Sequence, residues 1–427
     1  MLDKNTIRFL REKHLSPSMS LSYEEPLHIV RGEDQYLFDA NGKRYLDAIN
    51  NIQHVGHCHP KVVNAAQKQY EKLNTNTRYL DETIINYAKD LINKLPVGLD
   101  VCFFTNSGSE ANDLALRVAR HYTQSKETIV LDGAYHGNLS SLIEISPYKH
   151  DGPGGAGAPN YVNTISMPDT YRGKYRGNNA ADGYVDEVEK VIKQIQKNGN
   201  NMPVFIAESL MGCGGQLVMP EGFLKRANEL VRGAGGICIA DEVQIGFGRM
   251  GSHFWGFETC DVIPDIVTMG KSMGNGHPLS AVVTTHEIAE AFNNGMEYFN
   301  SFGGNSVSCA VGHAVLNVIE EEGLQENADD VGNYLIDQLN KIDNSLIGQV
   351  RGQGLFIGIE LIKDKDALTP AAKEADEIVN AMKDAGILMS TDGPDHNVLK
   401  IKPPIIFTRE NADELVLNLT SIFNEIS

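Results

Sequence analysis

Long apolar runs, an excess of basic residues and paired cysteines are all absent from this sequence of 427 residues. No apolar run approaches the ~18 residues that a membrane-spanning helix needs. Lys and Arg number 37 against 56 Asp and Glu, and the formal net charge of −19 would be repelled by phosphate backbones and anionic lipids. The sequence therefore predicts neither a nucleic-acid partner nor a membrane partner.

The six cysteines are scattered, without a CxxC motif or a metal-ligand spacing. This spacing predicts reduced thiols in a cytoplasmic protein. The opening stretch MLDKNTIRFLREKHL lacks the apolar segment of a secretion signal, and its Asp3 and Glu12 argue against a transit peptide. His54, His57 and His59 lie close together, but no further ligand set lies at metal spacing, so we predict no metal site.

Glycine is abundant, with 41 residues, and it clusters after short apolar runs. The Asn41-Gly42 pair between alternating apolar residues predicts a β-hairpin. From about 100 to 285, apolar strands alternate with amphipathic stretches at 109–124 and 221–234, a pattern typical of a mostly parallel sheet covered on both faces. The predicted strands are 100–105, 127–131, 203–207, 236–240, 265–269 and 280–284.

The rest of the chain predicts a smaller α+β lobe. Its expected elements are two helices within 306–345, a strand at 355–360, a helix near 371–386, a strand near 398–402 and a helix near 411–425. We predict a small domain made of residues 1–55 and 316–427, and a large domain made of residues 56–315. The Gly/Pro-rich stretch 151–159 predicts a long surface loop or lid.

Polar residues follow five of the predicted strands. In parallel sheets, ligands bind at the carboxyl ends of the strands. A Ser-Gly-Ser turn before a helix suits a phosphate, and an aromatic flanked by small residues suits stacking on a flat ring. Each feature alone is explained by a helix cap, a core aromatic or a surface charge, but the five together are not. These residues are Ser107, Gly108 and Ser109, then Tyr135, Glu208, Asp241 and Lys271.

A phosphate, a flat ring, a basic ring nitrogen and an aldehyde would use this set of groups. The sequence therefore predicts pyridoxal 5′-phosphate (PLP) as cofactor. Asp241 would keep the ring nitrogen protonated. Lys271, which lies between glycines, would bond to the aldehyde and then serve as general acid and base.

The motifs NSGSEAN, YHG, IADEVQIGFGR, DIVTMGKSMGNG and SFGGN resemble those of the class III PLP-dependent aminotransferases. The resemblance implies an α/β fold of type I, with a mostly parallel seven-stranded sheet in a large domain and a small α+β domain from both termini. It also implies a homodimer with shared active sites, and it leaves open whether dimers pair into tetramers. Lys271 and Asp241 would be catalytic. The cofactor contacts that it implies are Ser107, Gly108, Ser109, Tyr135, His136, Glu208, Asp241, Gln244, Lys271 and, on the neighbouring subunit's cofactor, Ser301.

Other stretches, among them AINNIQHVGHCHP, PDTYRGKYR and NVLKIKPP, resemble the phospho-lyases of this family. Lys400 stands where many transaminases have an arginine that clamps the substrate carboxylate, and lysine cannot form that planar fork. Ser209 replaces the usual proline of AEP, and the segment 47–57, with Asn50, is shorter than expected of transaminases. Each departure alone is also explained by sequence drift, whereas their agreement favours a phospho-lyase.

The predicted reaction is elimination of phosphate from O-phosphoethanolamine, which yields acetaldehyde and ammonia. We expect Arg78, Lys400 and Asn50 to contact this small phosphorylated amine. Three alternatives stay open: an alanine–glyoxylate or ω-amino acid aminotransferase, 5-phosphohydroxylysine as substrate, and a non-catalytic protein, against which the intact Lys271 and Asp241 argue. Further candidate cations, equally explained as solvated surface charge, are Lys149, Arg172, Lys174 and Arg176.

Overall fold

A seven-stranded sheet forms the centre of the molecule. The computed structural model describes residues 1–200 and 203–426, so positions 201, 202 and 427 of the predicted domains lie outside the described residues. The strand order is β4-β12-β11-β10-β7-β5-β6, and only β12 is antiparallel to its neighbours. The predicted mostly parallel seven-stranded sheet is therefore confirmed. Its strands are β4 (Val101–Thr105), β5 (Thr128–Leu131), β6 (Val162–Ile165), β7 (Val204–Ala207), β10 (Ile237–Asp241), β11 (Ile266–Met269) and β12 (Ser280–Thr284).

The sequence predicted every strand of this sheet except β6. That strand lies at the edge of the sheet, where only its two outer residues, Val162 and Ile165, are buried. The polar residues between them interrupt the continuous apolar run by which the other strands were recognised.

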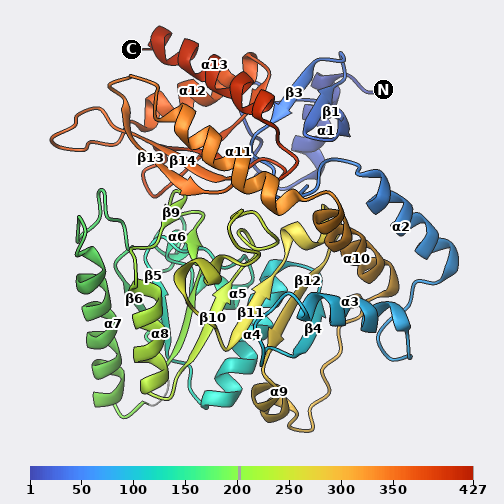
Figure 1. Ribbon diagram of the computed structural model, residues 1–427, viewed down its shortest axis with the longest axis vertical. Helices are drawn as coiled ribbons and strands as arrows, with labels where there is room; N and C mark the ends of the chain where they lie inside the picture. Colours follow the sequence, from blue (N-terminus) through green and yellow to red (C-terminus); the bar gives the residue numbers. More distant parts are fainter. Residues whose placement is uncertain (201–202, 427) are drawn as a thin grey trace.

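Helices cover both faces of the sheet (Figure 1). Alternate residues of a strand point to opposite faces, and Ile129 and Leu131 of β5 pack in the core under α7 (Ala180–Lys197) and α8 (Phe223–Gly233). Val130, between them, packs in the other core under α4 (Gly108–Thr123). The sheet is thus buried on both sides, which leaves the ends of its strands as the place for a site.

Further helices flank the sheet. Helix α10 (Ser306–Glu321) packs against α2 (Pro60–Lys72) and α3 (Glu82–Ile92). The predicted domain boundary at 315 falls inside α10, and the boundaries stay a prediction. The remaining elements of this part are α5 (Ser140–Ile143), α6 (Pro147–His150), α9 (His286–Phe292), the hairpin of β8 (Leu210–Met211) and β9 (Leu217–Val218), and the short 3-10 turns η1 (Gly256–Cys260) and η2 (Lys271–Gly274).

A smaller α+β lobe lies above the large sheet in Figure 1 and is built from both ends of the chain. Strand β15 pairs in parallel with β3, so that Ile387 lies beside Leu46. The predicted hairpin is present between β2 and β3, and Gly42 adopts a φ of +84° in its turn. The lobe comprises β1 (Ile29–Glu33), β2 (Tyr36–Asp39), β3 (Arg44–Asp47), β13 (Ile347–Gln353), β14 (Phe356–Leu361), β15 (Ile387–Leu388), β16 (Ser390–Asp392), β17 (Val398–Ile401), α11 (Leu324–Leu339), α12 (Ala372–Asp384) and α13 (Arg409–Ile426).

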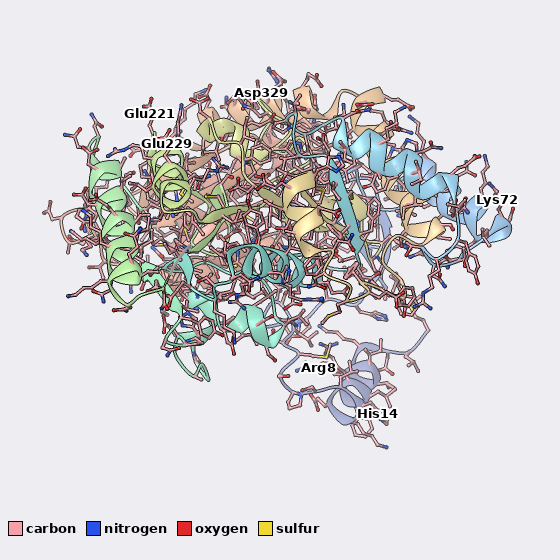
Figure 2. All side chains as sticks on the ribbon, turned by 90° about the horizontal axis from the view of Figure 1, so that it is seen from below. Arg8, His14, Lys72, Glu221, Glu229 and Asp329 are labelled. Carbon is pink, nitrogen blue, oxygen red and sulfur yellow. The ribbon has the colours of Figure 1, made fainter. Side chains whose placement is uncertain are left out.

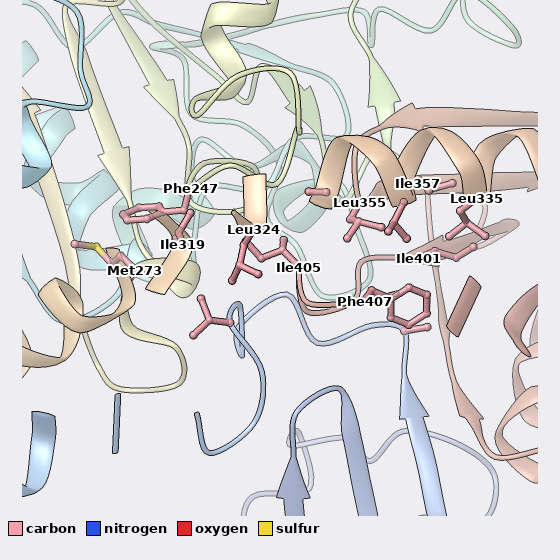
Figure 3. Packing of buried hydrophobic residues seen from close by; sticks show 14 of the residues in the cluster. Phe247, Met273, Ile319, Leu324, Leu335, Leu355, Ile357, Ile401, Ile405 and Phe407 are labelled. Atoms are coloured by element: carbon pink, nitrogen blue, oxygen red, sulfur yellow. The ribbon is translucent and has the colours of Figure 1, made fainter. Parts of the chain in front are cut away.

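One hydrophobic core joins the two lobes. Leu335 of α11 and Ile401 of β17 belong to the same buried cluster as Phe247 and Met273, which lie in the segments after β10 and β11 (Figure 3). The small lobe is therefore packed directly onto the loops at the carboxyl ends of the strands.

Helix α1 (Lys4–His14) stands out from the body of the molecule, and it has no buried residue (Figure 2). Its side chains include Arg8 and His14, which Figure 2 labels. Within residues 1–200 and 203–426, no helix is long and apolar enough to cross a membrane.

Candidate active site

A cavity of about 520 Å³ lies at the carboxyl ends of the central strands. Nine of its lining residues come from the sets that the sequence analysis selected. They are Ser107, Gly108, Ser109, Tyr135, His136, Glu208, Asp241, Gln244 and Lys271.

The turn before α4 packs closely against the segments that follow β5 and β10. Ser107 caps the helix, and its Oγ accepts a hydrogen bond from Glu110 N at 3.2 Å. A Cβ at Gly108 would lie 2.7 Å from Val243 Cγ1, and one at Gly137, whose φ is +140°, would lie 2.6 Å from Ser109 Oγ. Only glycine fits at these two positions. The first turn of α4 thus presents backbone N–H groups and the positive end of the helix dipole to the cavity.

Asp241 is held rigidly at the end of β10. Its Oδ2 accepts hydrogen bonds from Asn112 Nδ2 and His136 Nδ1, both at 2.8 Å, and its Oδ1 accepts one from Val243 N at 3.1 Å. The side chain is almost fully buried, and these three donors compensate for the loss of water. Sequence reasoning missed Asn112, although it lies one helical turn after Gly108, on the same face of α4.

Glu208 follows β7 and lies close to Asp241. Its Oε1 accepts hydrogen bonds from Gly212 N at 3.2 Å and from Gln244 Nε2 at 3.3 Å. Burial, with a smaller contribution from the charge of Asp241, raises the pKa of the Glu208 carboxyl to about 7.

Gln244 links the cavity to both ends of the chain. Its Oε1 accepts hydrogen bonds from Asn51 Nδ2 at 3.3 Å and from Lys402 Nζ at 3.0 Å. Neither partner was among the predicted site residues. Lys402 lies directly after β17, two residues beyond the predicted Lys400, and no local pattern distinguished the two lysines.

Lys271 follows β11 and begins the turn η2, with a φ of 36° in the left-handed region. Burial lowers the pKa of its ammonium group, and the charge of Lys400 adds to this effect. A lowered pKa increases the fraction of neutral amine, which is the form that acts as nucleophile and base. The half-buried ring of Tyr135 lies against the ring of Tyr148, edge to face, with centroids 6.0 Å apart.

The family profile described as aminotransferase class-III matches residues 19–423. The chain belongs to the class-III aminotransferases. Similar relatives in this family include "Alanine--glyoxylate aminotransferase 2-like" of Drosophila melanogaster, 50% identical over 99% of this chain and 89% of that protein. "Ethanolamine-phosphate phospho-lyase homolog 1" of Caenorhabditis elegans is 42% identical over 93% of this chain and 89% of that protein. A solved phospholyase from Arthrobacter, in complex with phosphoethanolamine, has a TM-score of 0.93 and 39% identity over 98% of this chain and 99% of that one.

Class-III aminotransferases depend on PLP, and the residues present fit that cofactor. Beyond the glycine turn, three cavity-lining residues carry a buried polar atom that has no hydrogen-bond partner among the described residues: His136 Nε2, Asn112 Oδ1 and Glu208 Oε2. Unpaired buried polar atoms are rare in proteins. Their concentration in one cavity is as expected of groups that contact a bound cofactor.

Four residues that the family resemblance selected lie outside the cavity lining, and one of them, Lys400, pairs with Asp392 at 3.1 Å. The Arg78 guanidinium is exposed, pairs with Glu297 at 3.0 Å and lies over the ring of Phe299. Ser301, two residues after Phe299, is also exposed. The Asn50 side chain donates to Asp47 Oδ2 at 2.9 Å, so it supports the loop that carries Asn51.

The other candidate cations also lie outside the cavity lining. Lys149 Nζ lies 5.8 Å from the ring centroid of Tyr135, which keeps it near the cavity. Arg172 pairs with Glu360 and with Asp395. The remaining two are surface residues: Lys174 pairs with Glu187 at 2.7 Å, and Arg176 donates to the backbone oxygens of Gly173 and Arg172.

The three neighbouring histidines have separate partners. His54 Nε2 lies 2.7 Å from Phe247 O, and His57 Nε2 lies 2.7 Å from Asp47 Oδ2. His59 faces Glu322 at 3.4 Å. Within the described parts of the chain, no group of three or more potential metal ligands is brought together.

Proposed function

We propose that this class-III enzyme is a phospho-lyase that converts O-phosphoethanolamine and water into acetaldehyde, ammonia and inorganic phosphate. The observation that carries the proposal is Lys400. By the family resemblance it stands where many transaminases have the arginine that clamps a carboxylate, and its Nζ lies 3.1 Å from Asp392 Oδ1. A lysine is a point charge that suits phosphate, whereas a bidentate carboxylate contact needs a guanidinium. The likeness to the Arthrobacter phospholyase supports the same conclusion.

Bound PLP would supply an electron sink for negative charge on the substrate carbon that bears the nitrogen. Gly108 and Ser109 would hold its phosphate, Tyr135 would stack on its ring, and Gln244 would contact the ring oxygen. Asp241, oriented by Asn112 and His136, would place a fixed negative charge beside the ring nitrogen.

Lys271 is the proposed base. Its lowered pKa favours the neutral amine, which can take a proton from the carbon next to the substrate nitrogen. The electron pair of that C–H bond becomes the new C–C π bond, and the C–O bond to phosphate breaks with its pair on the leaving phosphate. Phosphate is a good leaving group, so elimination can precede the return of the proton that transamination requires.

A second candidate is transamination of the alanine–glyoxylate or ω-amino acid type. The name of the Drosophila relative, at 50% identity, favours it. A third is elimination from 5-phosphohydroxylysine, whose larger outer part would reach toward the loop 151–159. We also propose a homodimer with shared sites, because the exposed Ser301 and Arg78 could then reach the partner's cavity.

The test is phosphate release from phosphoethanolamine by the PLP-loaded protein without a keto acid. Sustained phosphate with equimolar acetaldehyde supports the phospho-lyase. Alanine formed from pyruvate and a donor amine, without phosphate release, would contradict it in favour of the transaminase. Parallel turnover of 5-phosphohydroxylysine ranks the two phosphorylated substrates.

A further inference from the structure

Two lysines and one carboxylate lie together beside the cavity. Asp392 Oδ1 is 3.1 Å from Lys400 Nζ, and Asp392 Oδ2 is 3.4 Å from Lys402 Nζ. Lys402 also donates to Gln244 Oε1 at 3.0 Å, and Gln244 lines the cavity with Lys271. The cluster of Lys400, Lys402 and Asp392 is therefore joined to the cavity through the Gln244 side chain and lies just behind the cavity lining.

This cluster carries a surplus of positive charge. Lys402 and Asp392 are buried, with exposures of 3% and 8%. Within the cluster, the one carboxylate of Asp392 faces the two ammonium groups of Lys400 and Lys402. Lys271 also acts on Lys402, but it has carboxylates of its own nearby. The nearby Cys213 does not offset the surplus, because burial raises the pKa of its thiol to about 12. An uncompensated buried charge is costly, and an anion that enters the cluster removes that cost.

The cluster also has hydrogen-bond donors to spare. Each lysine ammonium has three N–H donors. Lys400 uses one, on Asp392, and Lys402 uses two, on Asp392 and Gln244. The remaining three donors have no hydrogen-bond partner in residues 1–200 and 203–426, although the Lys402 ammonium also lies over the ring of Phe356. A phosphate monoester carries a charge of about −1.5 to −2 at neutral pH and offers three acceptor oxygens.

Two nearby arginines, Arg351 of β13 and Arg172 of the segment between β6 and α7, are already engaged. Arg351 pairs with Glu360, and Arg172 pairs with Glu360 and with Asp395 at 2.8 Å. These two guanidinium groups are thus balanced by two carboxylates. The free positive charge beside the cavity belongs to lysines, which favours phosphate over the planar carboxylate of an amino acid.

We propose that Lys402, assisted by Lys400, binds the phosphate group of the substrate and selects phosphorylated amines over α-amino acids. This inference rests on the proposed function and adds to it a residue that selects the substrate. Two carbons and one oxygen separate the amine nitrogen from phosphorus in phosphoethanolamine. The phosphate must therefore lie close to Lys271, as the cluster does, with Gln244 between the cofactor and phosphate positions.

Calorimetric titration of the PLP-loaded enzyme with inorganic phosphate tests this directly. In Lys402→Gln, we expect phosphate affinity to fall about ten- to hundredfold, the usual range for one charged hydrogen bond. The variant should keep its fold, since Asp392 retains Lys400 and the Gln216 amide as partners. Lys383→Gln is the matched control, because Lys383 is also a buried lysine, 6% exposed, but its ammonium pairs with Asp384 and not with a residue of the cavity lining.

Lys400→Gln is a second variant, and it leaves the buried Lys402 in place. We expect it to weaken phosphate binding at least threefold. The KM for phosphoethanolamine should rise in both variants, with kcat changed much less. Wild-type affinity for phosphate in both would overturn the inference, even if the wild type is a phospho-lyase. Absence of phosphate release by the wild type would instead overturn the proposed function, and the calorimetry would still decide the phosphate site.

Discussion

The carboxylate of Glu242, next to Asp241, provides a quantitative test of the electrostatics around the site. It is 1% exposed, and it accepts hydrogen bonds from Gly256 N at 2.8 Å, Phe257 N at 2.9 Å and Ser209 Oγ at 3.2 Å. Burial nevertheless raises its pKa from 4.5 to about 7. The folded protein therefore binds this proton more tightly than the unfolded chain does, and the associated stability is present below pH 4.5 and lost as the pH rises through 7.

At about 1.36 kcal/mol per pKa unit, the loss amounts to about 3 kcal/mol between these pH values. The substitution Glu242→Gln abolishes the titration but has its own cost. An amide has one acceptor oxygen, so either Gly256 N or Phe257 N loses its partner, at about 1–3 kcal/mol. We expect the variant to be less stable than the wild type by this amount at pH 5. By pH 8 the difference should shrink by about 3 kcal/mol and vanish or reverse.

Urea unfolding of both proteins at several pH values, compared through midpoints and m values, measures this difference. Thr123→Val is the control, because it removes one buried hydrogen bond, to Ala119 O at 2.9 Å, without removing an ionisable group. Its stability difference should stay constant with pH. A constant difference for Glu242→Gln as well would refute the reasoning, since the carboxylate would then not titrate between pH 5 and 8.

Four further outcomes follow from the site. Lys271→Ala should lose phosphate release together with the visible absorbance of covalently bound cofactor, and an unchanged spectrum would contradict the assignment. Asp241→Asn should lower kcat by about 10²–10³-fold at saturating PLP, as removal of one preorganised electrostatic contact does. Gly108→Ala should weaken PLP binding at least tenfold in a fluorescence titration, because the new methyl would lie 2.7 Å from Val243 Cγ1. Burial lowers the pKa of Lys402 to about 8, so the KM for phosphoethanolamine should rise above pH 8 in the wild type. Lys402→Gln should lack that rise when KM is measured from pH 6 to 9.5.

The positions of site residues at the carboxyl ends of the large-sheet strands could be predicted from the sequence. Lys271, Asp241 and Gly108 each follow a buried strand, and parallel topology brings the ends of such strands to one edge. The apolar runs also identified six of the seven large-sheet strands. Strand β6 was missed because an edge strand needs no continuous apolar run.

Contacts between distant segments were harder to predict. Lys402 reaches Gln244 across 158 positions, and no local pattern indicates which of two lysines in LKIKPP will be buried. Asn112 resembles any polar residue on a helix until its hydrogen bond to Asp241 is seen. The partners of Arg78 also depend on segments far away, here Glu297, 219 positions later.

The pairing of β3 with β15 sets an order of events during synthesis. Leu46 needs Ile387 beside it, and these residues are 341 positions apart. At the usual ~5–20 residues per second, the ribosome takes on the order of half a minute to make the second strand after the first. During that interval Tyr45 and Leu46, which are 4% and 0% exposed in the folded protein, cannot be buried by their final neighbours. Strand β3 is thus synthesised early but obtains its neighbour β15 only late. Until then its apolar residues are accessible to a chaperone that binds nascent chains.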